Sequence, residues 1–305
     1  MFSTKSGAAK LSLIIVIALV ALKASVAAIT GSLSIIAQTT DSFLDIVAVA
    51  TTFFAVRIAS KPADEEHPFG HGKMENVAAV GQALLIFAAG GVIIYSAVRR
   101  MITGAPIEMT EAGMAVMVVS IIASIFLSRH LRKVARATDS IALEANAHNI
   151  ATDVYSAAAV LVGLIIIRFS ELNIVDSIIA LAVAVLIVKV GYDVVKKSFG
   201  GLVDVKLPEA EENAIRASVT QYSDKLIDFH ELRTRKAGSH RYIDLHLVIY
   251  KYASVEVAHK ICDDLEQDIK NQLPHTSIVI HVEPCDEKCE ECPIPPDKRH
   301  ENTLH

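Results

Sequence analysis

Residues 32–57 read SLSIIAQTTDSFLDIVAVATTFFAVR, a run of apolar and small residues that is interrupted by two acids. The run is longer than the ~20 residues that an α-helix needs to cross a bilayer. Asp41 and Asp45 lie four residues apart in it, so a helix places both carboxylates on one face. An ionised carboxylate at the bilayer centre costs roughly 2.5–3.5 kcal/mol, and the pair therefore indicates a compensating cation. The alternative is that each acid bonds to a neighbouring helix.

The composition of the whole chain is that of a membrane protein with a soluble appendage. Hydrophobic residues make up 52% of the 305 residues, and the mean hydropathy is +0.42. Ordinary globular proteins are roughly 45–50% apolar even when glycine is counted. Six apolar stretches come near the length of a membrane-crossing helix. They are residues 9–29, 32–57, 76–98, 112–128, 140–168 and 173–195.

Basic residues are distributed unevenly between the two sides of these spans. One side holds Lys5, Lys10, Arg57, Lys61, Lys73, Arg129, Arg132, Lys133, Arg136, Lys196 and Lys197, and the other holds Arg99, Arg100 and Arg168. Because cytoplasmic loops carry the excess of Lys and Arg, both termini are predicted to be cytoplasmic. We expect a multi-pass protein in the lipid bilayer of the cell (inner) membrane. The net charge is only −5 and no basic run indicates a nucleic-acid partner.

After Lys197 the composition changes, and residues 206–284 have the pattern of a small α/β domain. The expected elements are a helix over 208–221, strands over 226–234 and 241–250, an amphipathic helix over 254–272 and a strand over 276–282. The predicted fold is thus six transmembrane helices plus an α-β-β-α-β, ferredoxin-like cytoplasmic domain. We place the boundaries at 1–205, 206–284 and a flexible, cysteine-containing tail over 285–305. A unit of this size folds more comfortably when it pairs with a copy of itself.

The fifth span offers partners for the aspartate pair. Asn149 and Asp153 are again four residues apart, so two helices could supply four side-chain ligands to one divalent ion. His148 lies roughly 140° around the helix from Asp153 and joins this face only if the helix is distorted. Polar packing between helices is the alternative, because Asn and His also serve as interhelical contacts.

The loop after the second span contains Asp64, His67 and His71. One carboxylate and two imidazoles within eight residues can wrap a divalent ion near the membrane surface. A hydrated loop that leads into a helix is the alternative.

The soluble domain is rich in histidine. Several of its imidazoles lie in strand-like runs and could converge with Glu283 on a metal, although scattered surface histidines give the same composition. These histidines are His230, His240, His246, His259, His275 and His281. Cys285, Cys289 and Cys292 form C-x3-C-x2-C, which would need a fourth ligand to bind zinc. An unstructured tail that carries thiols is equally consistent with this spacing. A disulfide framework is not expected in the cytoplasm.

These runs together resemble the cation diffusion facilitator family, and in particular its bacterial YiiP-like zinc and ferrous-iron efflux branch. The resemblance rests on Asp41-Ser-Phe-Leu-Asp45, on residues 67–75 (HPFGHGKME), on Asn149-x3-Asp153 and on residues 230–235 (HELRTR), and it covers about residues 9–284. It implies a homodimer that pairs through its cytoplasmic domains, with a charge contact between Lys73 and Asp204.

The resemblance also implies three metal sites. The transport site is Asp41, Asp45, Asn149 and Asp153; the interfacial site is Asp64, His67 and His71; the cytoplasmic site is His230, His246, His259, His281 and Glu283. Two residues depart from the family pattern, since zinc exporters usually have His at Asn149 and Asp at Glu283. An amide in place of an imidazole favours harder ions such as Mn²⁺ or Fe²⁺. His148, Cys285, Cys289 and Cys292 are accessory candidates.

We therefore expect a secondary transporter, not an enzyme, that exports Zn²⁺ or Fe²⁺, or Mn²⁺ as the nearest alternative, in exchange for protons. Zn²⁺ is the first choice of ion and Cd²⁺ is also compatible. Carboxylates crowded in a desolvated site hold protons that an arriving cation displaces, which suits antiport. A membrane-anchored metal sensor is the main rival. A membrane hydrolase lacks support, because the chain has no Gly-x-Ser-x-Gly or His-Glu-x-x-His run.

Overall fold

The computed structural model describes residues 3–30, 33–103, 111–170 and 173–285. Some side chains within these ranges, including that of Asp41, lie outside the description. The chain divides into two compact units, Met1–Leu202 and Val203–His305, which we treat separately.

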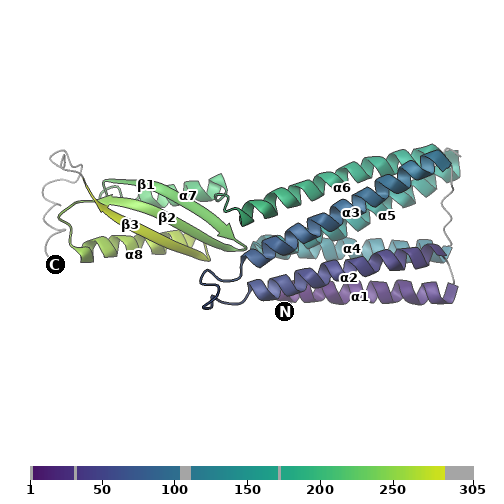
Figure 1. Ribbon diagram of the computed structural model, residues 1–305, viewed down its shortest axis with the longest axis horizontal. Coiled ribbons are helices and arrows are strands. Elements are labelled where there is room, and N and C mark those ends of the chain that lie inside the picture. Colours follow the sequence, from purple (N-terminus) through teal and green to yellow (C-terminus); the bar gives the residue numbers. More distant parts are fainter. Residues whose placement is uncertain (1–2, 31–32, 104–110, 171–172, 286–305) are drawn as a thin grey trace. The chain divides into compact units, whose positions relative to one another are not determined.

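The first unit is built from the six predicted spans, each of which forms one long helix (Figure 1). The helices are α1 (Lys5–Thr30), α2 (Leu33–Ala59), α3 (Lys73–Thr103), α4 (Glu111–Thr138), α5 (Ile141–Ser170) and α6 (Asn173–Leu202). In the described residues, segments of α1, α3, α4 and α6 have the length and apolarity of membrane-crossing helices. Large apolar side chains such as Phe54, Leu84 and Phe126 are exposed, as a lipid-facing surface requires. The predicted helical transmembrane domain is confirmed.

Two kinds of packing organise these helices. Helices α1, α2, α4 and α5 share an apolar core that includes Val20, Val56, Leu131 and Leu143. Helix α3 runs along α6, where glycines allow a close approach (Figure 1). A Cβ added at Gly191 would lie 3.1 Å from the Phe87 ring, which is tighter than an ordinary contact, so a larger residue there would require the Phe87 side chain to shift.

The second unit is the predicted α/β domain. Its elements are α7 (Glu209–Thr220), β1 (Asp228–Ala237), β2 (His240–Ile249), α8 (Val255–Gln272) and β3 (Thr276–Pro284). The sheet has the order β1-β2-β3, with β1 antiparallel to β2 and β2 parallel to β3. The α-β-β-α-β order is confirmed, with element ends that differ from the predicted ones by at most three residues.

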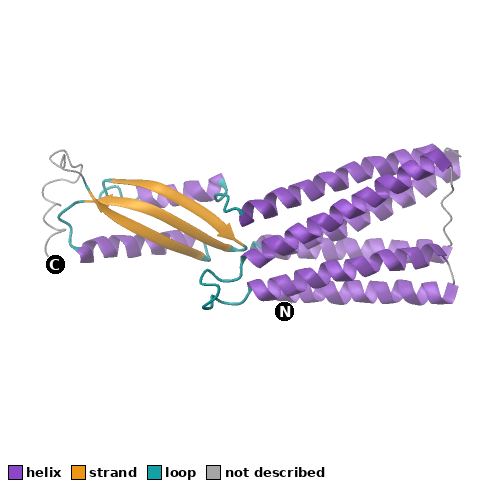
Figure 2. Cartoon of the chain, viewed as in Figure 1, coloured by secondary structure: helices purple, strands orange, loops and turns teal. Residues whose placement is uncertain are grey.

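Alternation along the strands decides which side chains face the core of this domain. Ile243, Leu245 and Leu247 point to a core that they share with Ile215 of α7 and Leu265 of α8. Both helices therefore pack on one face of the sheet (Figure 2). The intervening residues, including His246, project from the opposite face, which no described helix covers.

Candidate metal-binding sites

The expected transport residues lie on two helices that pack together, α2 and α5. Asp45 on α2 and Asp153 on α5 are partly buried, and Asn149 on α5 is 6% exposed. The side chain of Asp41 lies outside the described residues, so the four-residue site stays a prediction. The structure brings together the helices that carry these residues, as the prediction requires.

His148 occupies a different part of α5. It lines a pocket of about 110 Å³ between α5 and α6, together with Glu144, Asp193 and Lys197. Lys197 forms an ion pair with Glu144 at the edge of this pocket. His148 thus faces α6, and its place in the predicted transport site with Asp153 of α5 and the acids of α2 stays a prediction.

The loop residues Asp64, His67 and His71 form a compact group. One ligand atom from each lies within 4.8 Å of the others. The Asp64 carboxylate is 3.1 Å from Nδ1 of His67 and 3.5 Å from Nε2 of His71. One oxygen and two nitrogen donors at this spacing suit a divalent transition metal such as Zn²⁺.

Local backbone bonds hold this loop in shape. The His67 amide donates to Oδ1 of Asp64 (2.7 Å), and the Gly70 amide donates to the His67 carbonyl (2.8 Å) with Gly70 at a φ of 75°. The hydrogen bond from the His67 backbone amide is the main cause that lowers the pKa of Asp64, and the charges of His71 and His67 lower it further. Asp64 is therefore ionised and ready to bind a cation at neutral pH. Nδ1 of His71 is buried and has no hydrogen-bond partner among the described residues.

The first turn of α3 follows this loop directly and ties it to three helices. Glu75 is 2% exposed and accepts from Nζ of Lys5 on α1 (2.9 Å) and from Oγ of Ser140 (2.5 Å), which precedes α5. Asn76 donates to the Ser198 carbonyl of α6 (3.1 Å). Glu75 ends the run HPFGHGKME, and no role was predicted for it from the sequence. The sequence feature that could have indicated its role is the position of an acid at the start of a predicted membrane span.

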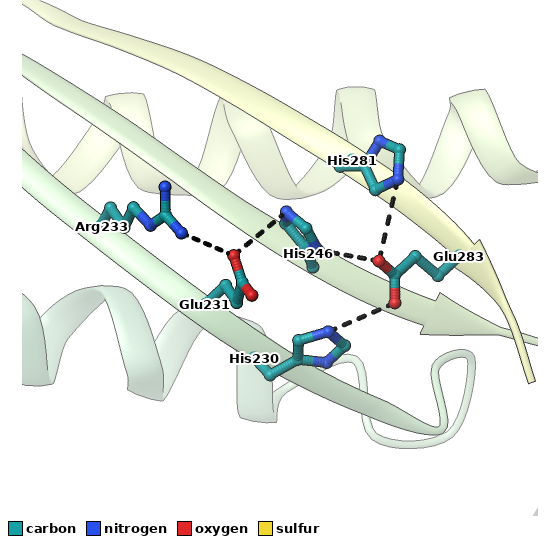
Figure 3. Close-up of polar contacts among 6 residues, drawn as sticks. All are labelled: His230, Glu231, Arg233, His246, His281 and Glu283. Carbon is teal, nitrogen blue, oxygen red and sulfur yellow. Dashed lines mark hydrogen bonds and ion pairs between the residues drawn. The ribbon is translucent and has the colours of Figure 1, made fainter.

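The histidine-rich cluster of the second unit forms across all three strands (Figure 3). The strand register pairs His246 with His230 on β1 and with His281 on β3, so the three imidazoles stand in one row on the open face of the sheet. Glu283, two residues after His281, projects to the same face and supplies a carboxylate to this row.

Glu283 is the centre of the cluster. Its Oε1 lies 2.9 Å from Nδ1 of His246, and its Oε2 lies 3.2 Å from Nε2 of His230. These three residues also form a group with ligand atoms within 4.8 Å of one another. His281 is farther away, with Nε2 at 3.8 Å from Glu283 and 65% exposure. Imidazole nitrogens with one carboxylate are a donor set that suits zinc and similar ions.

A residue absent from the sequence-based set, Glu231, also approaches the cluster. It lies in a β-bulge between His230 and Arg233 and has a φ of 49°. This conformation directs its carboxylate to 3.8 Å from Nε2 of His246 and 2.9 Å from Arg233 (Figure 3). A bulge inserts one residue that a regular alternation does not anticipate, so a period-two reading of β1 could not place Glu231 on this face.

His259 is not part of the cluster in the single chain. It lies on α8 and is 3.7 Å from Asp263, with both side chains largely exposed. It also lines a pocket of about 490 Å³ with Cys262 and Glu266. Its assignment to the cytoplasmic site therefore stays a prediction that would require a ligand from elsewhere.

The remaining expected residues have these positions. Lys73 donates to the Leu202 carbonyl (3.4 Å), and Asp204 lies 3.6 Å from Arg235; their mutual contact stays a prediction. Cys285 is buried and disulfide-bonded, contrary to the expected free thiol, so its sulfur is not available to a metal in this state. Cys289 and Cys292 lie outside the described residues.

Comparisons with known proteins agree with the two units. Residues 9–203 match the model of the cation efflux transmembrane domain, and residues 207–285 match the cytoplasmic domain of cation efflux proteins. The chain is 34% identical over 259 residues to the cation-efflux pump FieF of Pectobacterium atrosepticum, which covers 84% of each chain. It is 30% identical over 279 residues to the uncharacterized transporter sll1263 of Synechocystis, with 92% of this chain and 90% of the relative covered.

A solved structure of CzrB in its zinc form is also similar. It is 36% identical, covers 28% of this chain and 97% of its own, and superposes with a TM-score of 0.27. With family models that together span almost all of residues 9–285, the chain belongs to the cation diffusion facilitator family of metal cation efflux proteins.

Proposed function

We propose that this protein exports a divalent transition-metal ion, Zn²⁺ or Fe²⁺, from the cytoplasm in exchange for protons. The observation that carries the proposal is the placement of carboxylates on two helices that pack within the membrane domain, Asp45 on α2 and Asp153 on α5. The membrane makes such acids costly unless a cation or a proton neutralises them. A site that must hold either one or the other couples their movements.

The two groups on the cytoplasmic side fit accessory roles. The loop group of Asp64, His67 and His71 and the cluster around Glu283 both offer imidazole and carboxylate donors to the same class of ion. Each group has at least one exposed ligand, Asp64 and His67 in the loop and His230 on the sheet, so ions can reach both groups from solvent. We assign them to capture and regulation, with pairing of two copies through the cytoplasmic domains.

Proton-coupled export is tested in sealed vesicles that contain the full chain. We expect metal-dependent proton flux from the parent and none from Asp45→Ala. Asp193→Ala, which removes an exposed acid on α6 outside the predicted site, is the matched control and should retain the flux. Equal flux from the parent and Asp45→Ala would remove the aspartates from the mechanism.

The choice of ion is tested at Asn149. Replacing the amide by an imidazole in Asn149→His adds a nitrogen donor and should shift the preference toward Zn²⁺ and away from Mn²⁺. Competition among Zn²⁺, Mn²⁺, Fe²⁺ and Cd²⁺ in the same vesicles measures this preference. An unchanged order of ion preference in Asn149→His would mean that Asn149 does not contribute to selectivity. A strong preference of the parent for Mn²⁺ would support the alternative, which is manganese export.

A membrane-anchored sensor is a second candidate, because the ligands of the cluster on the sheet, His230, His246 and Glu283, all come from the second unit. In a sensor, His246→Ala would abolish the metal response while Asp45→Ala would leave it intact. The transporter predicts the reverse ranking of the two variants.

A further inference from the structure

Two histidines outside all of the sites above lie side by side at one end of the sheet. His240 begins β2, and His275 immediately precedes β3. The next residues of the two strands, Arg241 and Thr276, are register partners, which places both histidines at the same end. His246 lies six residues farther along β2, about 20 Å away at the usual rise of a strand. The pair is therefore separate from the cluster around Glu283.

The spacing of the two rings matches that of histidine pairs in the cluster. The ring centroids of His240 and His275 are 5.6 Å apart, and the planes are inclined by 57°. The corresponding values are 5.3 Å and 57° for His230 and His246, and 4.8 Å and 53° for His246 and His281. Two imidazoles at this separation can direct one nitrogen each to a shared ion at a bond length of ~2.0–2.1 Å.

A buried arginine fixes the backbone that carries the pair. Arg241 is 9% exposed, and its guanidinium binds the Glu211 carboxylate through two bonds of 2.7 and 2.9 Å. The same side chain donates to the Pro274 carbonyl (3.2 Å), and its backbone amide donates to the His275 carbonyl (2.9 Å). Arg241, the residue that follows His240, thus hydrogen-bonds to the carbonyls of both Pro274 and His275.

The backbone of His275 is also unusual. Its φ of 59° lies in the left-handed region, which few residues other than glycine adopt, although Asn, Asp and His do so more often than most. Thr276 supports the same turn by donating to the Leu273 carbonyl (2.5 Å). The two imidazoles are therefore presented from an ordered frame, which reduces the entropy lost when both bind one ion.

We propose that His240 and His275 form an additional metal-binding site, which takes a divalent transition ion through two imidazole nitrogens and completes its shell with water. Both side chains are exposed, so the ion and its waters have access. Imidazole donors favour Cu²⁺, Ni²⁺ and Zn²⁺ over Mg²⁺ or Ca²⁺, which prefer oxygen. This site is independent of the transport mechanism and adds metal capacity to the cytoplasmic domain.

The site is tested on the full chain in detergent, in a background that carries Asp45→Asn, His67→Ala, His230→Ala and His246→Ala to weaken the other sites. Equilibrium dialysis against Zn²⁺ counts the bound ions. The double variant His240→Gln/His275→Asn should bind one ion fewer than this background. Each single variant should bind it roughly 100-fold more weakly, because a second ligand held in place acts at high effective concentration. Asn is chosen at position 275 because it tolerates the left-handed backbone.

A spectroscopic signal separates a two-histidine site from general loss of binding. Pulsed EPR of the background with one equivalent of Cu²⁺ should show modulation from two imidazoles, and the double variant should lose it. His130→Gln, which removes a histidine of α4 that belongs to none of these sites, should change neither measurement. Equal ion counts and equal modulation in the background and the double variant would overturn the proposal.

Discussion

The carboxylate of Glu75, at the start of α3, is almost completely buried. It is joined to Lys5 of α1 and to Ser140, whose hydroxyl also accepts from the Leu143 amide at the start of α5. One side chain therefore links three helices directly after the loop that carries Asp64, His67 and His71. A buried charge is tolerated only when it is paired, which explains why Lys5 and Ser140 lie together at this point.

We predict that Glu75→Gln lowers the free energy of unfolding by about 1–3 kcal/mol. The amide keeps the shape of the side chain but loses the charge-assisted bond to Lys5, and hydrogen bonds to charged groups typically contribute roughly that amount. Chemical denaturation of the full chain in detergent measures the change. Lys270→Gln is the control, because its exposed i,i+4 pair with Glu266 is worth only ~0–1 kcal/mol. A Glu75→Gln value no larger than that of the control would mean that the link is unimportant for stability.

The lowered pKa of Asp64 makes a prediction about metal binding by the loop. Its folded-state pKa lies below the ordinary value of 3.8 for an aspartate, so its contacts are fully present above pH 3.8 and are lost as the pH falls through the lowered pKa. Between pH 5 and 7.5 Asp64 therefore stays ionised. Zn²⁺ affinity of the parent, measured by titration calorimetry, should exceed that of Asp64→Asn throughout this range, because the parent keeps an ionised carboxylate ligand. A parent affinity no higher than that of Asp64→Asn at pH 5 would contradict this.

At the scale of single elements, the bulge in β1 gives the cytoplasmic cluster an extra carboxylate at a cost in backbone energy. A non-glycine residue in the left-handed region is disfavoured by roughly 1–2 kcal/mol, and Glu231 adopts it with a φ of 49°. The bulge lets Glu231 join the face that carries His230 and His246 while Leu232 still packs against the apolar core. The strand therefore trades some stability for a side-chain direction that a regular strand cannot provide.

The matched variants Glu231→Gly and Glu231→Ala separate the two effects of this bulge. Both remove the carboxylate, but only glycine relieves the backbone, so Glu231→Gly should be more stable than Glu231→Ala by about 1 kcal/mol. Thermal unfolding of the cytoplasmic domain within the full chain measures the difference. Both variants should weaken metal binding by the cluster to the same extent. Equal stability of the two variants would show that the cost of the left-handed backbone at position 231 is no larger than the extra chain entropy that glycine loses on folding.

The elements themselves were predictable from the sequence, whereas several side-chain positions were not. Runs of ~20 apolar residues predicted the six long helices of the first unit, and period-two alternation predicted β1 and β2. The sequence could not reveal the extra residue in β1, the burial of Glu75 or the approach of His240 to His275. Each of these depends on register or on contacts between residues far apart in the chain, which periodicity does not encode.

At the scale of the whole molecule, the number of membrane helices decides which parts share a compartment. Six crossings return the chain to the side on which it began, so the N-terminus, the loop over residues 60–72 and the second unit are expected on one side. The excess of Lys and Arg on this side of the helices predicts that it is the cytoplasmic side. Both groups of candidate ligands, around Asp64 and around Glu283, would then meet cytoplasmic metal before it enters the membrane domain.

This arrangement is tested by single cysteines in a chain whose four native cysteines are replaced by serine. Glu66 lies in the loop that precedes α3, and Thr103 is the last residue of α3; both are exposed. The two substitutions are Glu66→Cys and Thr103→Cys. A thiol reagent that cannot cross membranes should label Thr103→Cys in intact cells and Glu66→Cys only after the cells are opened. Because α3 is 31 residues long, it spans about 46 Å and cannot place both ends on one side of a bilayer ~30 Å thick in its hydrocarbon core. Labelling of Glu66→Cys in intact cells would reverse the orientation, and the proposed direction of metal export would reverse with it.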